Sequence, residues 1–194
     1  MWPSMRKINE IFYSLQGEGM HAGRPAVFIR FAGCNLQCSF CDTDFSVQRE
    51  MSDEEIRDEL RKYPASFVVL TGGEPTLSVD RDFIRMLKEE GRYVAIETNG
   101  TQPIPQGIDW VCCSPKGVGE YLKRISVCNE LKVVYQGQDL APYFDCKAEH
   151  YLLQPCDTGD AARNRELTQA AIRVCLDDPR WRLSLQTHKL IGIR

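Results

Sequence analysis

Residues 26–41 read AVFIRFAGCNLQCSFC, and this stretch indicates the fold more clearly than any other part of the chain. Its first six residues are mostly β-branched or aromatic, a composition typical of a strand that is buried on both faces. Its last eight residues contain three cysteines, so the predicted strand leads directly into a loop of metal-binding side chains. In α/β folds, ligands bind at the carboxyl ends of parallel strands, which is where this loop lies.

The rest of the chain continues the pattern of short buried strands, with helices between some of them. Helices are predicted at residues 52–63, 80–90 and 161–176, and the first opens with a capping box formed by Ser52 and Glu55. Strands alternating with helices predict an α/β fold with a mainly parallel sheet. The further strands are predicted at residues 67–70, 93–97, 110–113, 131–135, 151–154 and 182–185.

The composition is that of an ordinary globular protein. The 194 residues are 43% hydrophobic and 26% charged with a formal net charge of −3, and we expect a single domain over residues 1–194. A protein with this net negative charge offers no basic surface for binding nucleic acid. No stretch approaches the roughly 18 apolar residues of a membrane span, and residues 1–7 precede no apolar run of a signal peptide. We therefore expect a cytoplasmic protein that binds neither nucleic acid nor membrane.

The cysteines indicate a metal site. The chain has nine cysteines, and Cys34, Cys38 and Cys41 lie within eight residues, which in a reducing compartment favours metal binding over disulfides. Thiolates suit iron–sulfur clusters or zinc. Three thiolates can bind three corners of a 4Fe–4S cubane and leave the fourth iron open for a cofactor. A zinc site would need a fourth ligand, usually in a second paired motif, and no second C-x-x-C is present. Buried structural cysteines are the remaining alternative.

Four later segments also follow predicted strands. Residues 71–75 read TGGEP; the glycines allow close approach of the backbone to a ligand, and Glu74 can pair with an ammonium group. Residues 97–100, 114–116 and 154–157 follow three further strands. Each segment alone is also consistent with a simple turn, so it is their shared position at strand ends that predicts a common binding site.

The C-x3-C-x2-C spacing, with Phe40 before the last cysteine, resembles the signature of the radical S-adenosylmethionine (SAM) superfamily. The resemblance implies that Cys34, Cys38 and Cys41 bind a 4Fe–4S cluster whose fourth iron is chelated by SAM, and that Phe40 lies beside the adenine. The other residues that it implies for SAM binding are Gly73, Glu74, Glu97, Asn99, Ser114, Pro115, Lys116, Gln154, Pro155, Cys156 and Asp157.

Further motifs indicate which family of this superfamily the chain resembles. Residues 15–19 (LQGEG), Arg30, residues 41–43 (CDT) and residues 185–189 (LQTHK), together with the loops above, are similar to the 7-carboxy-7-deazaguanine synthase family of queuosine biosynthesis. The similarity extends from about residue 8 to residue 194. It implies a partial, trimmed (β/α) barrel, a homodimer, an electron donor such as flavodoxin, and Mg²⁺ bound by Thr43.

The family's substrate, 6-carboxy-5,6,7,8-tetrahydropterin, requires hydrogen-bonding groups for its ring edge and a cation for its carboxylate. Gln16 and Glu18 suit the ring edge, and Arg30 suits the carboxylate, although Arg30 could also be a strand residue whose charge reaches solvent. We further expect the apolar residues of the C-terminal tail, Leu190, Ile191 and Ile193, to pack against the barrel mouth. The residues assigned to the substrate are Leu15, Gln16, Gly17, Glu18, Arg30, Thr71, His188 and the terminal carboxylate of Arg194.

By resemblance, the enzyme is a carbon–nitrogen lyase. Reductive cleavage of SAM gives a 5′-deoxyadenosyl radical, which takes hydrogen from C6 of the pterin; the ring contracts, ammonia leaves and SAM is regenerated. One alternative is an activase of a glycyl-radical enzyme, which would need a surface for a protein substrate. A second is a non-enzymatic iron–sulfur carrier, although such proteins normally have four protein ligands on the cluster.

We predict that changing Cys34, Cys38 or Cys41 to alanine abolishes SAM cleavage, because three thiolates are the minimum that holds the cubane. The measurement is iron content and SAM cleavage after anaerobic reconstitution. Full iron content in the Cys38→Ala protein would contradict the ligand assignment. The controls are single changes to serine, which should leave cluster content unchanged, at Cys112, Cys113, Cys128, Cys146 and Cys175.

Overall fold

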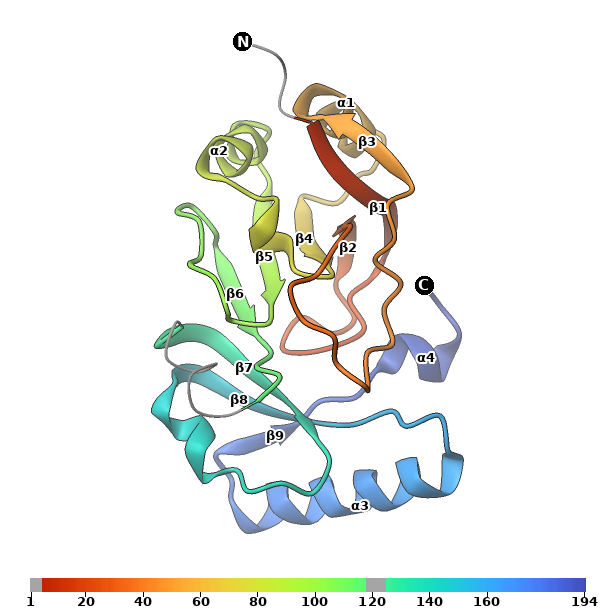
Figure 1. Ribbon diagram of the computed structural model, residues 1–194, viewed down its shortest axis with the longest axis vertical. Coiled ribbons are helices and arrows are strands. Elements are labelled where there is room, and N and C mark those ends of the chain that lie inside the picture. Colours follow the sequence, from red (N-terminus) through yellow and green to blue (C-terminus); the bar gives the residue numbers. More distant parts are fainter. Residues whose placement is uncertain (1–4, 118–124) are drawn as a thin grey trace.

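A computed structural model describes residues 5–117 and 125–194, so the first four residues of the segment assessed for a signal peptide lie outside the described residues. Within the described residues, all strands join one nine-stranded sheet in the order β3-β1-β2-β4-β5-β6-β7-β8-β9 (Figure 1). The strands are β1 (Met5–Leu15), β2 (Pro25–Phe31), β3 (Arg49–Ser52), β4 (Phe67–Gly72), β5 (Tyr93–Thr98), β6 (Trp110–Cys113), β7 (Val127–Tyr135), β8 (Lys147–Pro155) and β9 (Trp181–Leu183).

The sheet is parallel from β2 through β4 to β9, and β1, which lies between β2 and β3, pairs antiparallel with both. The two ends of the strand order, β3 and β9, do not pair, so the sheet curves without closing (Figure 1). The predicted α/β fold, a partial and trimmed barrel with mainly parallel strands, is therefore confirmed.

The helices agree with the sequence patterns in type and place. They are α1 (Asp53–Leu60), α2 (Arg81–Glu89), α3 (Ala161–Asp177) and α4 (Thr187–Ile191), with single 3₁₀ turns at η1 (Pro75–Leu77) and η3 (Ala141–Asp145). The capping box that was predicted for α1 is present: the Ser52 hydroxyl accepts the Glu55 N–H, and the Glu55 carboxylate accepts the Ser52 N–H at 2.7 Å. Strands β1 and β3 and helix α4 were not predicted, because their residues are too polar or too few to give a periodic apolar signal.

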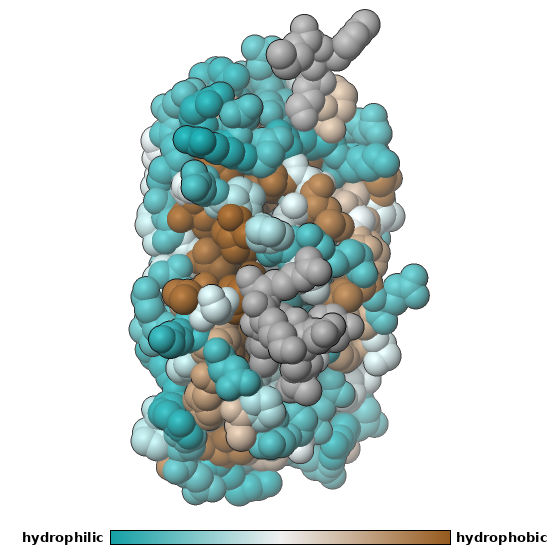
Figure 2. Space-filling model, turned by 60° about the vertical axis from the view of Figure 1, so that its left-hand side comes forward, coloured by the Kyte–Doolittle hydropathy of each residue, from teal (hydrophilic) through white to brown (hydrophobic). Residues whose placement is uncertain are grey.

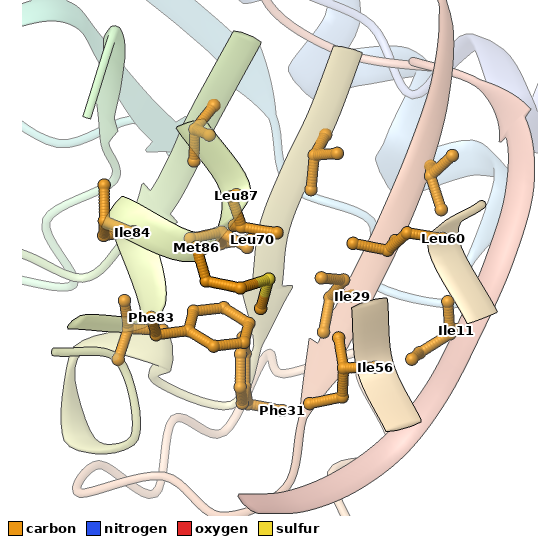
Figure 3. Close-up of a cluster of buried hydrophobic side chains, with 14 of the residues drawn as sticks. Ile11, Ile29, Phe31, Ile56, Leu60, Leu70, Phe83, Ile84, Met86 and Leu87 are labelled. Atoms are coloured by element: carbon orange, nitrogen blue, oxygen red, sulfur yellow. The ribbon is translucent and has the colours of Figure 1, made fainter. Parts of the chain in front are cut away.

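Alternation along the strands separates a helix-covered face from a cavity-facing one. On β2, Val27, Ile29 and Phe31 belong to the core shared with α1 and α2, whereas Ala26 and Phe28 belong to the inner cluster. Figure 3 shows this outer core: Ile56 and Leu60 from α1, and Phe83, Met86 and Leu87 from α2, lie against Ile29 and Leu70 of the sheet. The apolar stripe of each helix is thereby buried, and the opposite face of the sheet is left to bind a ligand.

The second half of the sheet has its own core. Leu131, Val133 and Tyr135 of β7 pack with Leu153 of β8 on the side that α3 covers, and Ala171 of α3 is fully buried there. Figure 1 shows α3 lying along β8 and β9, remote from α1 and α2. Within the described residues, none of the helices combines the length and apolar character that crossing a membrane requires.

The outer face of the sheet is less completely covered near β6 than near the helices. The segment from residue 99 to residue 109, between β5 and β6, is fully described and contains no helix. Ile104 and Val111 are therefore only partly buried although they pack against both cores. On the face drawn in Figure 2, hydrophobic side chains gather between two hydrophilic ends of the molecule.

Arg6 fixes the antiparallel edge to the helices. Its side chain is only 4% exposed, and its Nε and Nη2 donate to the Asp53 carboxylate at 2.6 and 3.0 Å. Nη2 also donates to Asp80 at 3.1 Å, and Nη1 donates to the Ser78 carbonyl. Since Asp53 begins α1 and Asp80 caps α2, one guanidinium joins β1 to the starts of both helices.

We predict that Arg6→Met lowers the free energy of unfolding by about 2 kcal/mol, less than a fully buried ion pair because both aspartates are partly exposed. The measurement is urea unfolding of the reconstituted protein. The matched control is Arg61→Met, which removes an exposed pair with Glu90 and should cost less than about 1 kcal/mol. Equal losses of unfolding free energy in the two variants would show that burial of Arg6 does not make its ion pairs more stabilising.

Candidate active site

A cavity of about 660 Å³ lies at the carboxyl ends of the parallel strands, a volume typical of small-molecule sites. Inward-facing residues near the strand ends line it, and register places Arg30 of β2 beside Thr71 of β4. The cysteine loop, the loop after β1 and the C-terminal segment complete the lining. Of the residues predicted for the site, the cavity brings together Leu15, Gln16, Gly17, Glu18, Arg30, Cys34, Cys38, Phe40, Cys41, Thr43, Thr71, Gly73, Glu97, Asn99, Ser114, Lys116, Gln154, Pro155, Cys156, Asp157, His188 and Arg194.

The three clustered thiols fit an iron–sulfur cluster. Cys34, Cys38 and Cys41 are all free thiols lining one cavity, and the Leu36 N–H donates to the Cys34 sulfur at 3.4 Å. Such N–H···S bonds are common around cluster thiolates. Among the described residues, no three His, Cys, Asp or Glu side chains converge on a point suited to one metal ion. The cluster does not require such convergence, since each thiolate binds a different iron.

Gly73 brings two ligand loops into contact. A Cβ on Gly73 would lie 2.0 Å from the Gly33 carbonyl oxygen, and the Glu74 N–H donates to that same oxygen at 3.0 Å. The glycine was expected to make room for a ligand. Its backbone neighbour is instead the residue before Cys34, so Gly73 lets the loop after β4 pack directly against the cysteine loop.

Glu74 and Pro115, both predicted to bind SAM, do not line the cavity. The Glu74 carboxylate is fully buried and accepts from the Thr98 hydroxyl and the Asn99 N–H, each at 2.7 Å. In the structure this carboxylate thus bonds to the loop after β5. Glu74 holds Asn99, whose side chain reaches the cysteine loop by donating to Asn35 at 3.0 Å.

A buried charge network lies on the floor of the cavity. Lys132 of β7 is 5% exposed; its ammonium donates to the Glu18 carboxylate at 2.5 Å and lies 3.7 Å from that of Glu97. Glu97, predicted to face SAM, lines the cavity while its carboxylate accepts from the Gln16 amide at 2.8 Å. Burial alone would raise the pKa of Glu18, but the Lys132 charge and hydrogen bond, with help from Gln186, lower that pKa to about 2.

The C-terminal segment is bound to the loop after β1. The Gly17 carbonyl accepts from the Thr187 N–H at 2.9 Å and from its hydroxyl at 2.6 Å, and the Ser184 hydroxyl accepts the Gly19 N–H at 3.1 Å. A Cβ on Gly17 would lie 2.2 Å from the His188 ring nitrogen Nδ1. Only glycine therefore allows His188 to sit against this loop and line the cavity.

A second set of ion pairs joins the tail to two ligand loops. The Lys189 ammonium donates to Asp42, beside Cys41, at 2.6 Å and to Asp157 at 2.8 Å. The hydrogen bond from Lys189 is the largest cause that lowers the pKa of Asp157 to about 2, so this carboxylate is ionised at neutral pH. The tail thus connects the cysteine loop with the loop after β8.

Arg30 has a carboxylate partner within the protein. Its Nε donates to Glu10, its register partner on β1, at 2.9 Å, and the Arg194 guanidinium contacts the same carboxylate. Two guanidiniums thus share the Glu10 carboxylate at this wall of the cavity, and the fork of donors on a guanidinium suits an anionic group. The Ser14 hydroxyl donates to an oxygen of the terminal carboxylate of Arg194 at 2.7 Å, which fixes the end of the chain.

The predicted packing of the tail is wrong for two of its three apolar residues. Leu190 and Ile191 are 71% and 62% exposed, and only Ile193 is partly buried. The reason is the short helix α4, which turns Thr187 and His188 toward the cavity side and leaves its apolar residues outside. Polar contacts, rather than an apolar plug, hold the tail in place.

Comparison with known proteins agrees with this geometry. The model of the radical SAM superfamily matches residues 28–130, which include the cysteine loop and strands β4 to β6. The chain is 58% identical over 191 residues to the 7-carboxy-7-deazaguanine synthase of Bacteroides thetaiotaomicron, covering 98% of this chain and 100% of that protein. This chain belongs to the 7-carboxy-7-deazaguanine synthase family.

More distant members of this synthase family also align along almost the whole chain. The synthase of Bordetella pertussis is 44% identical, covering 96% of this chain and 98% of that protein. The crystal structure of QueE from Escherichia coli is similar with a TM-score of 0.73 and 28% identity, covering 95% of each chain. These similarities favour the synthase over the activase and the electron carrier that the sequence left open.

Several residues of the site were not predicted. Lys132 has a signal in the sequence, a lysine inside the apolar run 131–135, but the pattern of this run by itself indicates only a strand. Gln186 and Lys189 lie in the segment that carried the resemblance and were not given roles. Glu10 had no signal, because strand β1 itself was not recognised.

We predict that appending a few glycines after Arg194 raises the KM for the pterin, because the terminal carboxylate is displaced while Thr187 and His188 stay in place. The measurement is kcat/KM of the extended protein beside the unmodified one. Unchanged kcat/KM would contradict a role of the carboxylate and leave the tail as a structural element only.

Proposed function

We propose that this chain converts 6-carboxy-5,6,7,8-tetrahydropterin to 7-carboxy-7-deazaguanine with loss of ammonia, as a carbon–nitrogen lyase of queuosine biosynthesis. One observation carries the proposal: a single cavity is lined both by three free thiols and by Gln16, Glu18 and Arg30. An iron–sulfur carrier would have no use for the second set. The whole chain, residues 1–194, is proposed to act as one radical SAM domain.

The thiolates of Cys34, Cys38 and Cys41 would hold the cluster, and the loops after β4, β5, β6 and β8 would hold SAM. When bound, these cofactors supply the 5′-deoxyadenosyl radical that abstracts hydrogen from the substrate. The residues of the chain orient the pterin and exclude competing hydrogen donors. Asn99, fixed by Glu74 and bonded to Asn35, couples the position of SAM-binding residues to that of the cysteine loop.

The residues around Arg30 and Glu18 would bind the pterin. Arg30 offers a guanidinium to the substrate carboxylate, with Glu10 shared between Arg30 and Arg194 as its counter-ion. The ionised Glu18 accepts N–H groups of the ring edge. His188 and Arg194 also line the cavity, and we propose that His188 and the terminal carboxylate of Arg194 complete the set.

Thr43 lines the cavity beside the cysteine loop and is proposed to bind Mg²⁺ together with substrate oxygens and water. The carboxylates on either side of Thr43 are already engaged, Asp42 by Lys189 and Asp44 by Ser46. Mg²⁺ binding would therefore depend on the substrate being present. We further propose a cytoplasmic homodimer that receives electrons from a donor such as flavodoxin.

The test is anaerobic reconstitution followed by assay of the pterin with SAM, reductant and Mg²⁺, with detection of 7-carboxy-7-deazaguanine. Arg30→Ala should raise the KM for the pterin roughly ten- to a hundredfold, the effect of losing a charge-assisted hydrogen bond, and leave SAM binding intact. Absence of product from the reconstituted protein would contradict the function. Equal weakening of pterin and SAM binding would show that Arg30 supports the loop and not the substrate.

A further inference from the structure

We propose that Lys132 is the positioning residue for Glu18: by its buried ion pair it keeps this carboxylate ionised and directed at the ring edge of the bound pterin. The inference rests on the proposed function for the identity of the ligand. It concerns a residue of β7 that belongs to none of the motifs described above, so the support comes from geometry alone.

The position of Lys132 follows from the sheet. On β7, Leu131 and Val133 belong to the outer core, so alternation directs Lys132 and its neighbours Glu130 and Val134 inward. A lysine at such a position has lost its water, because only 5% of its side chain is exposed. A buried ammonium requires carboxylate partners, and Lys132 has two, Glu18 at 2.5 Å and Glu97 at 3.7 Å.

The loop that carries Glu18 is also anchored to the same strand. The Glu130 carboxylate, two residues before Lys132 and 4% exposed, accepts the Met20 N–H at 2.8 Å. Glu130 and Lys132 thus bind the loop at two points, on its backbone and at its charged side chain. Glu18 is 14% exposed and lines the cavity; Lys132 holds its Oε2 and the Gln186 amide donates to its Oε1 at 2.9 Å, so a ligand would use the remaining lone pairs of this carboxylate.

Lys132 is the main group that lowers the pKa of Glu18, and the hydrogen bonds from Gln186 and Gln154 add to its effect. The groups that face Glu18 and Lys132 are Glu97 from β5, Cys112 from β6, Gln154 from β8 and Gln186 from the tail, and Asp42 lies beyond Gln186. Among them the two carboxylates repel a second negative charge and the amides carry none. Without Lys132, burial and these carboxylates would both raise the pKa of Glu18, so the group would take up a proton as the pH falls toward neutrality.

A protonated Glu18 would offer one acceptor fewer to the ring edge of the pterin. In Lys132→Met we therefore expect the KM for the pterin to rise roughly tenfold near neutral pH and to fall again as the pH is raised and Glu18 ionises. The KM of the unmodified enzyme should not follow this titration, since its Glu18 stays ionised throughout. A purely structural role of Lys132 would raise KM equally at every pH.

The experiment compares three reconstituted variants: Lys132→Met, Glu18→Gln, and the two together. If Lys132 acts through Glu18, adding Lys132→Met to Glu18→Gln changes the KM little, because the group being positioned is already gone. The double variant also removes the nearer of the two carboxylates that lose their cation, leaving only Glu97, and should fold where the single lysine variant does not. Effects on KM that add in the double variant would overturn the proposal.

A second readout needs no substrate. The infrared carboxylic-acid band of Glu18, assigned by its loss in Glu18→Gln, should appear near neutral pH in Lys132→Met and be absent from the unmodified protein. If the enzyme does not act on the pterin, the proposed function fails, yet this band still tests the ion pair. An ionised Glu18 in Lys132→Met at neutral pH would overturn the inference even in an active enzyme. The matched control is Lys88→Met, which removes a 2.6 Å ion pair with Asp109 outside the cavity and should change neither readout.

Discussion

The alternation of side chains along parallel strands is the constraint on which the rest of this structure depends. On β2, β4 and β5, one set of alternate residues packs in the core beneath α1 and α2, and the other set faces the concave interior. The outer set can be wholly apolar because helices cover it. The inner set is apolar near the strand starts, where Phe28, Phe67 and Ala95 pack together, and polar near the ends, where Arg30, Thr71 and Glu97 meet the cavity. A single periodicity therefore builds both the core and the site.

An open sheet leaves its interior exposed unless other segments cover it, and here the two ends of the chain do so. The loop after β1 and the segment after β9 lie against one another through Gly17, Thr187 and Ser184. Their contacts are hydrogen bonds and ion pairs rather than apolar packing, which leaves Leu190 and Ile191 on the surface. The part of the cavity that these two segments line thus forms only when residues nearly the whole chain length apart have come together.

Most of the charged side chains that line the cavity are paired with a side chain of opposite charge. Lys132 balances Glu18 and Glu97, Lys189 balances Asp42 and Asp157, and Glu10 is shared by Arg30 and Arg194. In a site of low dielectric, each isolated charge would instead change its protonation state. The pairing keeps the acceptors ionised and the donors charged before any ligand arrives, so a ligand finds them already oriented.

The sequence by itself determined the fold class, the cluster loop and most of the lining of the site. Strand periodicity is a local property, and ligand loops follow strand ends, so the segments around Cys34, Thr71, Glu97, Ser114 and Gln154 could be recognised from short stretches of chain. Strand β1 could not be recognised, because its buried charge, Arg6, is satisfied only by partners such as Asp53 and Asp80 that the fold supplies.

The tertiary structure decided which of the recognised residues face the cavity and what each carboxylate bonds to. It buried Glu74 behind Asn99, placed Gly73 against Gly33, and brought Lys132 under Glu18 across 114 residues of sequence. Ion pairs over such separations follow from strand order and register, which no local pattern encodes.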